Sequence, residues 1–225
     1  MKPLIILLTL LASASSNPLA LPSESKSPAV QPMPIINSQL TYIGPIKPGG
    51  ENVTLHGTAQ SVLAQIKSLN PSFHPDDFEV TRTARAKFEK TLAKRELELQ
   101  QRSKQGVTNC GLYGNALLDA NTIIPILSMP GACYVGGGPR TCVHLSCVND
   151  GGNNAVSLCN DNKAAIAPTC AYLGTYAQDI CGGKCAFSVD AGVFFPFIFC
   201  GGQEFDTDHY NVIVGTSLLD TSRRN

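Results

Sequence analysis

Three things are scarce in this chain: net positive charge, long apolar segments and, before residue 110, cysteine. The 17 basic and 17 acidic residues cancel, and from residue 96 onward seven Lys/Arg are outnumbered by eleven Asp/Glu. Binding to nucleic acid or to an anionic membrane needs a basic patch, so we expect neither partner. No segment after the N-terminal apolar run approaches the roughly 20 apolar residues of a transmembrane helix. We therefore expect no stable membrane insertion.

Recognisable catalytic and cofactor motifs are missing as well. The glycines at 136–138 lack the strand and helix that flank a phosphate-binding loop, and no serine lies in a nucleophile elbow. Cys142 and Cys147 are separated by four residues, but no second pair repeats at zinc-ligand spacing with a histidine nearby. We therefore predict no metal and no cofactor.

The N-terminus has the pattern of an export signal. Met1-Lys2 carries a positive charge, Pro3 to Ala12 is apolar, and Ala12-Ser13-Ala14 offers small residues at the spacing that signal peptidase accepts. The alternative is an N-terminal membrane anchor, for which the apolar run is short. We predict that residues 1–16 are a signal peptide and that the protein is secreted to the extracellular space.

All nine cysteines lie between Cys110 and Cys200. In an oxidising compartment this density predicts structural disulfides, and the odd number leaves at least one thiol unpaired. Eight paired cysteines allow about a hundred connectivities, so spacing alone assigns no partner to most of them: Cys110, Cys133, Cys147, Cys170, Cys181, Cys185 and Cys200.

One bridge follows from strand register. Residues 141–148 and 155–159 both alternate in polarity, and Asp150-Gly151 between them suits a hairpin turn. With that turn the opposing pairs are Val143 and Leu158, Leu145 and Val156, His144 and Ser157, and Cys142 and Cys159. A slip by one residue would mix the faces. We therefore predict a Cys142–Cys159 bridge, with Cys147 on the buried face reaching another element. Residues 152–154 offer a longer loop as an alternative.

The remaining cysteine-rich sequence predicts an α+β fold, a small disulfide-stapled domain in which two helices pack on an antiparallel sheet. One helix is expected at 115–127, bent or ended by Pro125, and a second at 168–181, stopped by Gly182-Gly183. The expected apolar stripe of the first is Leu117, Leu118, Asn121, Ile124 and Leu127, and that of the second is Cys170, Leu173, Ala177 and Ile180. A short buried run at 194–200 and a final strand at 209–214 complete the domain.

The leader, residues 17–95, is expected to be disordered and then helical. Residues 17–50 are Pro/Ser-rich and predict an extended or disordered segment. An amphipathic helix is expected at 58–69, with the stripe Val62, Leu63, Ile66 and Leu69, ended by Asn70-Pro71. A second, highly charged helix is expected from Pro75 to about Gln101, with a thin stripe of Phe78, Phe88 and Leu92.

The pair Lys94-Arg95 lies at the compositional boundary between leader and cysteine-rich sequence. A dibasic pair after a leucine suits the kexin-type proteases of the fungal secretory route, whereas the alternative is an ordinary solvated helix face. We predict a cut after Arg95, which makes 17–95 a propeptide and 96–225 the cysteine-rich domain, with its core at about 107–215. The one glycosylation sequon, at Asn52, lies in the propeptide.

The segments CVHLSC (142–147), CNDN (159–162), AQDI (177–180) and GGQEFDTDHYNVIV (201–214) resemble a group of small cysteine-rich proteins secreted by filamentous fungi, many of them discussed as effector candidates. In that group the first segment usually reads C-x-R-V-S-C, so His144 departs from the pattern, and the following loop is longer here. The cysteine order near Cys185 and Cys200 is faintly similar to that of smut killer toxins, at the level of fold alone.

Three functions remain open from the sequence. The first is a secreted effector or toxin-like protein that binds an extracellular protein or glycan after maturation. The second is a small hydrolase that uses the weak catalytic candidates Asp206, Asp208, His209 and Asp161, although such residues more often form polar turns. The third is a structural, wall-associated protein. We favour the first, and one cleft joining the four candidates would favour the second.

Overall fold

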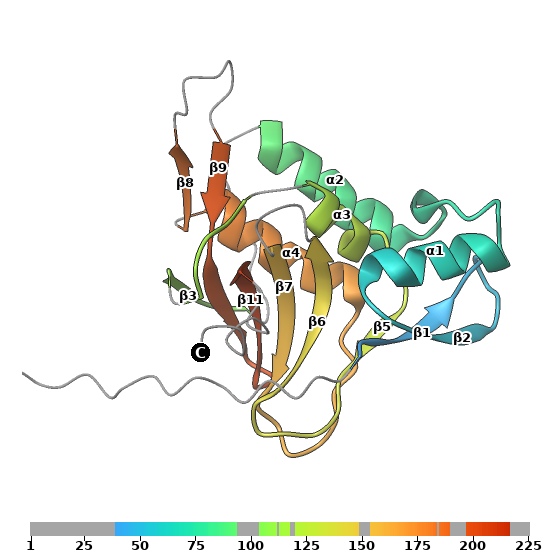
Figure 1. Ribbon diagram of the computed structural model, residues 1–225. Helices are drawn as coiled ribbons and strands as arrows, with labels where there is room; N and C mark the ends of the chain where they lie inside the picture. The colour runs from blue at the N-terminus through green and yellow to red at the C-terminus, as the bar shows by residue number, and fades with distance from the viewer. Residues whose placement is uncertain are drawn as a thin grey trace, which may run out of the picture. The chain divides into compact units, whose positions relative to one another are not determined.

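The computed structural model describes residues 39–93, 104–111, 113–117, 120–148, 154–183, 185–189 and 197–216. They form an α+β fold of helices and antiparallel sheets, as the sequence predicted (Figure 1). No helix in these ranges is long and apolar enough to cross a membrane. The predicted signal peptide and the Lys94-Arg95 pair lie outside the described ranges.

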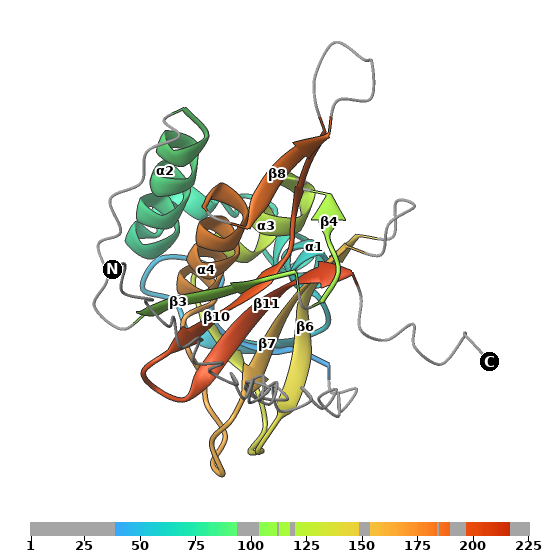
Figure 2. The same ribbon diagram turned by 90° about the vertical axis from the view of Figure 1, so that its left-hand side faces the viewer.

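The largest sheet has five antiparallel strands. Their spatial order is β3 (Lys104–Cys110), β10 (Gly202–Asp206), β11 (Tyr210–Thr216), β7 (Asn154–Asn160) and β6 (Thr141–Val148). Figure 2 shows the helices behind this sheet, on one of its faces. Val143, Leu158 and Val212 are almost fully buried in the core that the sheet shares with the helices, because alternate side chains of a strand point to the same side.

Strands β6 and β7 form the expected hairpin, with one correction. Three predicted pairs lie opposite each other: Cys142 and Cys159, Val143 and Leu158, and His144 and Ser157. Beyond His144 the register shifts, so that Val156 faces Ser146 and not Leu145. The irregularity buries both Leu145 and Ser146, which strict alternation does not allow. Because Val148 pairs with Asn154, residues 149–153 connect the two strands. This agrees with the longer loop that the sequence offered as an alternative and not with a two-residue turn at Asp150-Gly151, and the connecting residues themselves lie outside the described ranges.

Helix α4 (Cys170–Gly182) follows the prediction closely. All four residues of the predicted stripe have no exposed surface: Cys170, Leu173, Ala177 and Ile180. The other side of this helix is largely buried too, because α2 and α3 also pack against it.

Helix α3 (Ala120–Leu127) is shorter than predicted and turned about its axis. Leu117 lies in strand β4 (Ala116–Leu117), which pairs with β9 (Phe197–Cys200), so the helix begins later than the sequence pattern suggested. Ile126 is fully buried, as Leu127 is, whereas Asn121 and Ile124 are exposed. The predicted stripe was therefore wrong for these two residues. Pro125 lies inside the helix.

Two small sheets flank the central one. The first has the order β4, β9 and β8 (Ala186–Val189). The second has the order β2 (Asn52–His56), β1 (Thr41–Pro45) and β5 (Ala132–Tyr134). The sequence predicted no strands in the leader. Its β1–β2 hairpin buries Tyr42 and Leu55, and Gly49 at φ 67° provides a backbone conformation that other residues rarely adopt.

The two leader helices are α1 (Ala59–Leu69) and α2 (Glu79–Ala93), the latter after a short 3₁₀ turn at Pro75–Asp77. The side chain of Thr58 accepts a hydrogen bond from the backbone of Ser61 and caps α1. Val62 and Ile66 are fully buried, as predicted, but Leu69 is 58% exposed. In α2 the predicted Phe88 is buried, and the side chain of Leu92 lies outside the description.

Four disulfides join the elements of the cysteine-rich part. They link Cys110 with Cys185, Cys133 with Cys170, Cys142 with Cys159, and Cys181 with Cys200. The third is the bridge that strand register predicted. Cys147 is left unpaired, so the expectation that it reaches another element was wrong.

Candidate functional site

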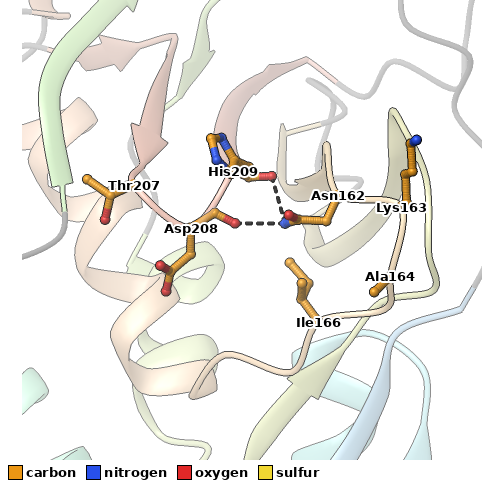
Figure 3. Close-up of a pocket in the computed structure, with 7 residues that line it drawn as sticks. All are labelled: Asn162, Lys163, Ala164, Ile166, Thr207, Asp208 and His209. Carbon is orange, nitrogen blue, oxygen red and sulfur yellow. Dashed lines mark hydrogen bonds between the residues drawn. The ribbon is translucent and has the colours of Figure 1, made fainter.

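A pocket opens where the loop after β7 meets the turn between β10 and β11 (Figure 3). Its volume is about 670 Å³. Lys163, Asp208 and His209 bring charged or ionisable groups to the lining, and Ile166 adds an apolar surface. The chemistry of this lining fits a polar ligand with some apolar area.

Hydrogen bonds hold the pocket in shape. The side-chain amide of Asn162 donates to the carbonyl oxygens of Asp208 at 2.7 Å and His209 at 3.1 Å. The backbone N–H of Asp161 donates to the same His209 carbonyl at 3.0 Å. His209 has a φ of 56°, in the left-handed region that few non-glycine residues adopt. The side chains of Asp208 and His209 are exposed on this fixed turn.

The four catalytic candidates do not share one cleft. Asp208 and His209 line the pocket, but Asp206 is 1% exposed, and its carboxylate accepts a hydrogen bond from the hydroxyl of Tyr176. Asp161 accepts a hydrogen bond of 2.9 Å from the side chain of Asn211 on the sheet. Among the residues that the structure describes, no group of three or more His, Cys, Asp or Glu could hold a metal ion.

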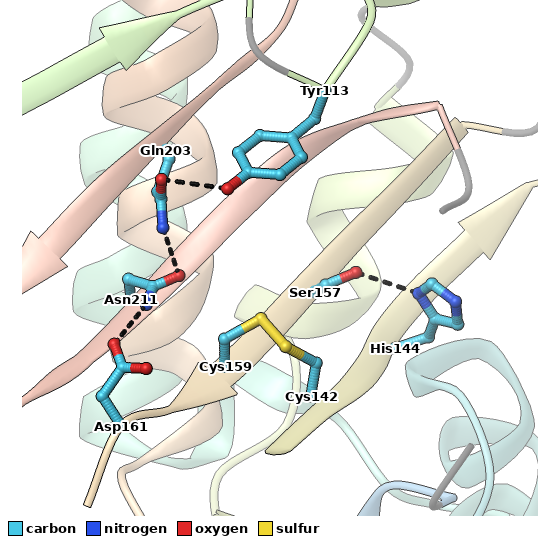
Figure 4. Close-up of a disulfide and its surroundings, with 8 residues drawn as sticks. All are labelled: Tyr113, Cys142, His144, Ser157, Cys159, Asp161, Gln203 and Asn211. Carbon is cyan, nitrogen blue, oxygen red and sulfur yellow. Dashed lines mark hydrogen bonds between the residues drawn. A yellow bond between two sulfur atoms is a disulfide. The ribbon is translucent and has the colours of Figure 1, made fainter. Parts of the chain in front are cut away.

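Polar side chains lie on both sides of the Cys142–Cys159 bridge on this face of the sheet (Figure 4), and Ile213 packs against the bridge itself. On one side of the bridge, Nδ1 of His144 lies 2.9 Å from the hydroxyl of Ser157. Burial lowers the pKa of His144, and its Nε2 has no partner among the described residues. The pair resembles a base and a hydroxyl, yet no carboxylate is hydrogen-bonded to the imidazole, so the third member of a catalytic triad is missing from the described residues.

On the other side of the bridge, a chain of hydrogen bonds joins strands β10 and β11 to the loop residues Tyr113 and Asp161. The hydroxyl of Tyr113 donates to Gln203 at 3.2 Å, the amide of Gln203 donates to Asn211 at 2.9 Å, and the amide of Asn211 donates to Asp161. Figure 4 shows these side chains in a row along the sheet. Since each amide both donates and accepts, the chain fixes the position of Asp161 beside the pocket loop.

A charged cluster lies buried between the sheet and the helices. Lys104 donates to the carboxylate of Asp179, and its ammonium lies 4.2 Å from the ring centre of Tyr176. Glu204 is 1% exposed, and burial raises its pKa to about 7, against the opposing effect of Lys104. Because solvent barely reaches these groups, we interpret the cluster as part of the structure and not as a reaction centre.

The unpaired thiol of Cys147 is half-buried, and we expect it to react slowly. Burial raises its pKa to about 11, so at neutral pH it stays protonated, and the thiol form is a poor nucleophile.

Asn52, the predicted glycosylation position, begins β2, and its side chain is exposed. The sequon is therefore accessible for modification, which stays a prediction.

No family model, curated protein or solved structure matches the chain.

Sequence reasoning missed most of the pocket and all of the buried cluster. Asp208 and His209 stood out as an acidic residue beside a histidine, but the contribution of Asn162 depends on two loops that are 46 residues apart in sequence. The cluster joins Lys104 and Asp179, 75 residues apart. The hydroxyls of Tyr172 and Tyr176 lie 3.0 Å apart, and the spacing of these two residues by one helical turn is the one local signal that could have indicated this contact.

Proposed function

We propose that this protein is a secreted effector or toxin-like protein, which binds an extracellular protein or glycan after a cut that follows Arg95. The observation that carries the proposal is the set of four disulfides. They tie β3 to the start of β8, β5 to α4, β6 to β7, and α4 to β9. Such a frame suits an oxidising exterior, where bridges form and persist.

The pocket between the two loops is the binding surface that this proposal uses. Its charged groups, Lys163, Asp208 and His209, lie on backbone that hydrogen bonds hold in place. A fixed surface loses little conformational entropy on binding. Proteins and glycans both offer the hydroxyl, amide and charged groups that such a lining can bind.

The hydrolase alternative has weaker support. It relies on Asp208 and His209 alone, since Asp206 and Asp161 are engaged in hydrogen bonds elsewhere. No specific observation favours a wall-associated structural role.

The test uses the full chain secreted by a fungal host, applied to plant tissue and to competing fungi. The variant Asp208→Asn/His209→Asn removes two of the pocket's three ionisable groups and leaves Lys163 in place. Asparagine tolerates the positive φ at 209. We expect the wild-type protein to damage the plant tissue or the competing fungus. We expect the variant to have at least tenfold lower activity in the same assay. The control Lys67→Ala changes an exposed residue of α1 and should keep full activity. Equal activity of all three proteins would contradict a role for the pocket, and no activity from the wild type would contradict the toxin-like function.

A further inference from the structure

The leader contributes a large part of the core. Residues 39–93 are named here the leader block, and residues 104–216 the cysteine-rich part. Ten buried apolar residues of one continuous core cluster come from the leader block: Leu40, Tyr42, Leu55, Ala59, Val62, Ile66, Phe73, Phe78, Ala84 and Phe88. The same cluster includes Ile126 of α3 and Leu173 of α4. The two segments are therefore packed together as one interior.

Backbone pairing joins the two segments as well. Strand β1 pairs with β5, with Tyr42 opposite Cys133, and the Cys133–Cys170 bridge fixes β5 to α4. The backbones come very close beside this pairing, because a Cβ added to Gly131 would lie 2.5 Å from the carbonyl oxygen of Ile43. The cysteine-rich part thus presents a strand edge that is already in position to receive β1.

Leader atoms also satisfy buried polar groups of the cysteine-rich part. The amide of Gln60 in α1 donates to the hydroxyl of Ser146 at 2.6 Å and to the carbonyl of Asn121 at 3.1 Å. The amide of Gln178 in α4 donates to the carbonyl of Lys87 in α2 at 3.2 Å. Ser146 and Gln178 are 0% and 2% exposed. Removing the leader block would break these bonds and expose the apolar faces of α3 and α4.

No disulfide links the two segments, since the leader block contains no cysteine. After a cut that follows Arg95, only these non-covalent contacts would hold it. We propose that the leader block stays bound after the cut, as a second chain of the mature protein. The surface that binds it consists of the β5 edge and the sides of α3 and α4 on which α1 and α2 pack. This inference depends on the processing step of the proposed function.

The experiment separates the two proposals by placing an added protease site between Arg95 and Glu96. Full-length protein is folded, cut with that protease and passed through a size-exclusion column at neutral pH and at several dilutions. Mass spectrometry then identifies the chains in each peak. We expect both chains in one peak. Leader and cysteine-rich chains in separate peaks would overturn the inference. Failure of natural processing would show instead as uncut protein in the culture medium.

A matched pair of variants tests the interface. Ile66→Ala removes a fully buried side chain of α1, and Leu69→Ala changes a side chain of the same helix that is 58% exposed. In the cut protein we expect Ile66→Ala to raise, by at least tenfold, the concentration below which the two chains dissociate. Leu69→Ala should leave this concentration unchanged. Equal behaviour of the two variants would show that the chains are not held by this packing.

Discussion

At the scale of single residues, burial raises the pKa of Glu204. Its carboxyl lies near Lys104, Asp179 and Lys87, which act on its charge in opposite directions. A carboxyl whose pKa rises on folding contributes stability that is fully present below its unfolded pKa, near 4.5, and is lost as the pH rises through the folded value of about 7. Other groups add their own dependence, so the contribution of Glu204 must be measured by difference.

We predict that Glu204→Gln removes this pH dependence. The wild type should lose roughly 1 to 3 kcal/mol of unfolding free energy between about pH 5 and about pH 8, relative to the variant. Denaturant unfolding at both pH values gives the comparison. The control Glu79→Gln, at an exposed position, should retain the wild-type difference. A parallel pH response of Glu204→Gln and wild type would contradict the assignment.

Cys147 offers a second test at this scale. Because its thiol is half-buried and its pKa is raised to about 11, iodoacetamide should label the native protein slowly at neutral pH. Denaturation without reduction should allow rapid labelling of this one cysteine. Peptide mapping identifies the labelled site. Rapid labelling of the native protein, or labelling at another cysteine, would show that the assignment of the free thiol is wrong.

At the scale of elements, some parts of the fold were readable from the sequence because their signal is local. The stripe of α4 follows from helical periodicity, and the pairs made by Cys142, Val143 and His144 in the β6–β7 hairpin follow from strand alternation and the matching of apolar faces. The predicted stripe of α3 was wrong because tertiary contacts override local preference. Leu117 pairs with β9 and lies in a strand. The neighbouring elements bury Ile126 and leave Ile124 exposed.

The face of α3 can be tested by a pair of isoleucine variants. Ile126→Ala should cost about 2 to 5 kcal/mol of unfolding free energy, because it leaves a cavity in the core. Ile124 is 37% exposed, so Ile124→Ala should cost less than about 1 kcal/mol. Denaturant unfolding under oxidising conditions gives both values. A larger loss of unfolding free energy for Ile124→Ala than for Ile126→Ala would show that the stripe predicted from the sequence is correct.

The leader hairpin was missed for a related reason. Strands β1 and β2 are five residues each, and a lone hairpin of this size is marginal in water. It is stable here because β5 adds a third strand and because Tyr42 enters the shared core. Strand β1 lies within the Pro/Ser-rich segment at 17–50, so its local sequence gave no indication of the sheet that it joins.

At the scale of the whole molecule, composition suggested two parts divided near Arg95, whereas the described residues share one core across that boundary. Cysteine content marks where the bridges are, but it does not mark where the packing ends. The two pocket residues that the sequence singled out, Asp208 and His209, lie together because they are neighbours in one turn, while Asp161 and Asp206 point to other contacts.

The most direct test of this account is the intact mass of the protein recovered from culture medium, measured under denaturing conditions before and after reduction. We predict two chains, one that ends at Arg95 and carries a glycan at Asn52, and one from Glu96 to Asn225 that gains the mass of the hydrogens of four reduced disulfides. A single uncut chain would contradict the proposed maturation, and a mass gain for fewer bridges would contradict the disulfide frame.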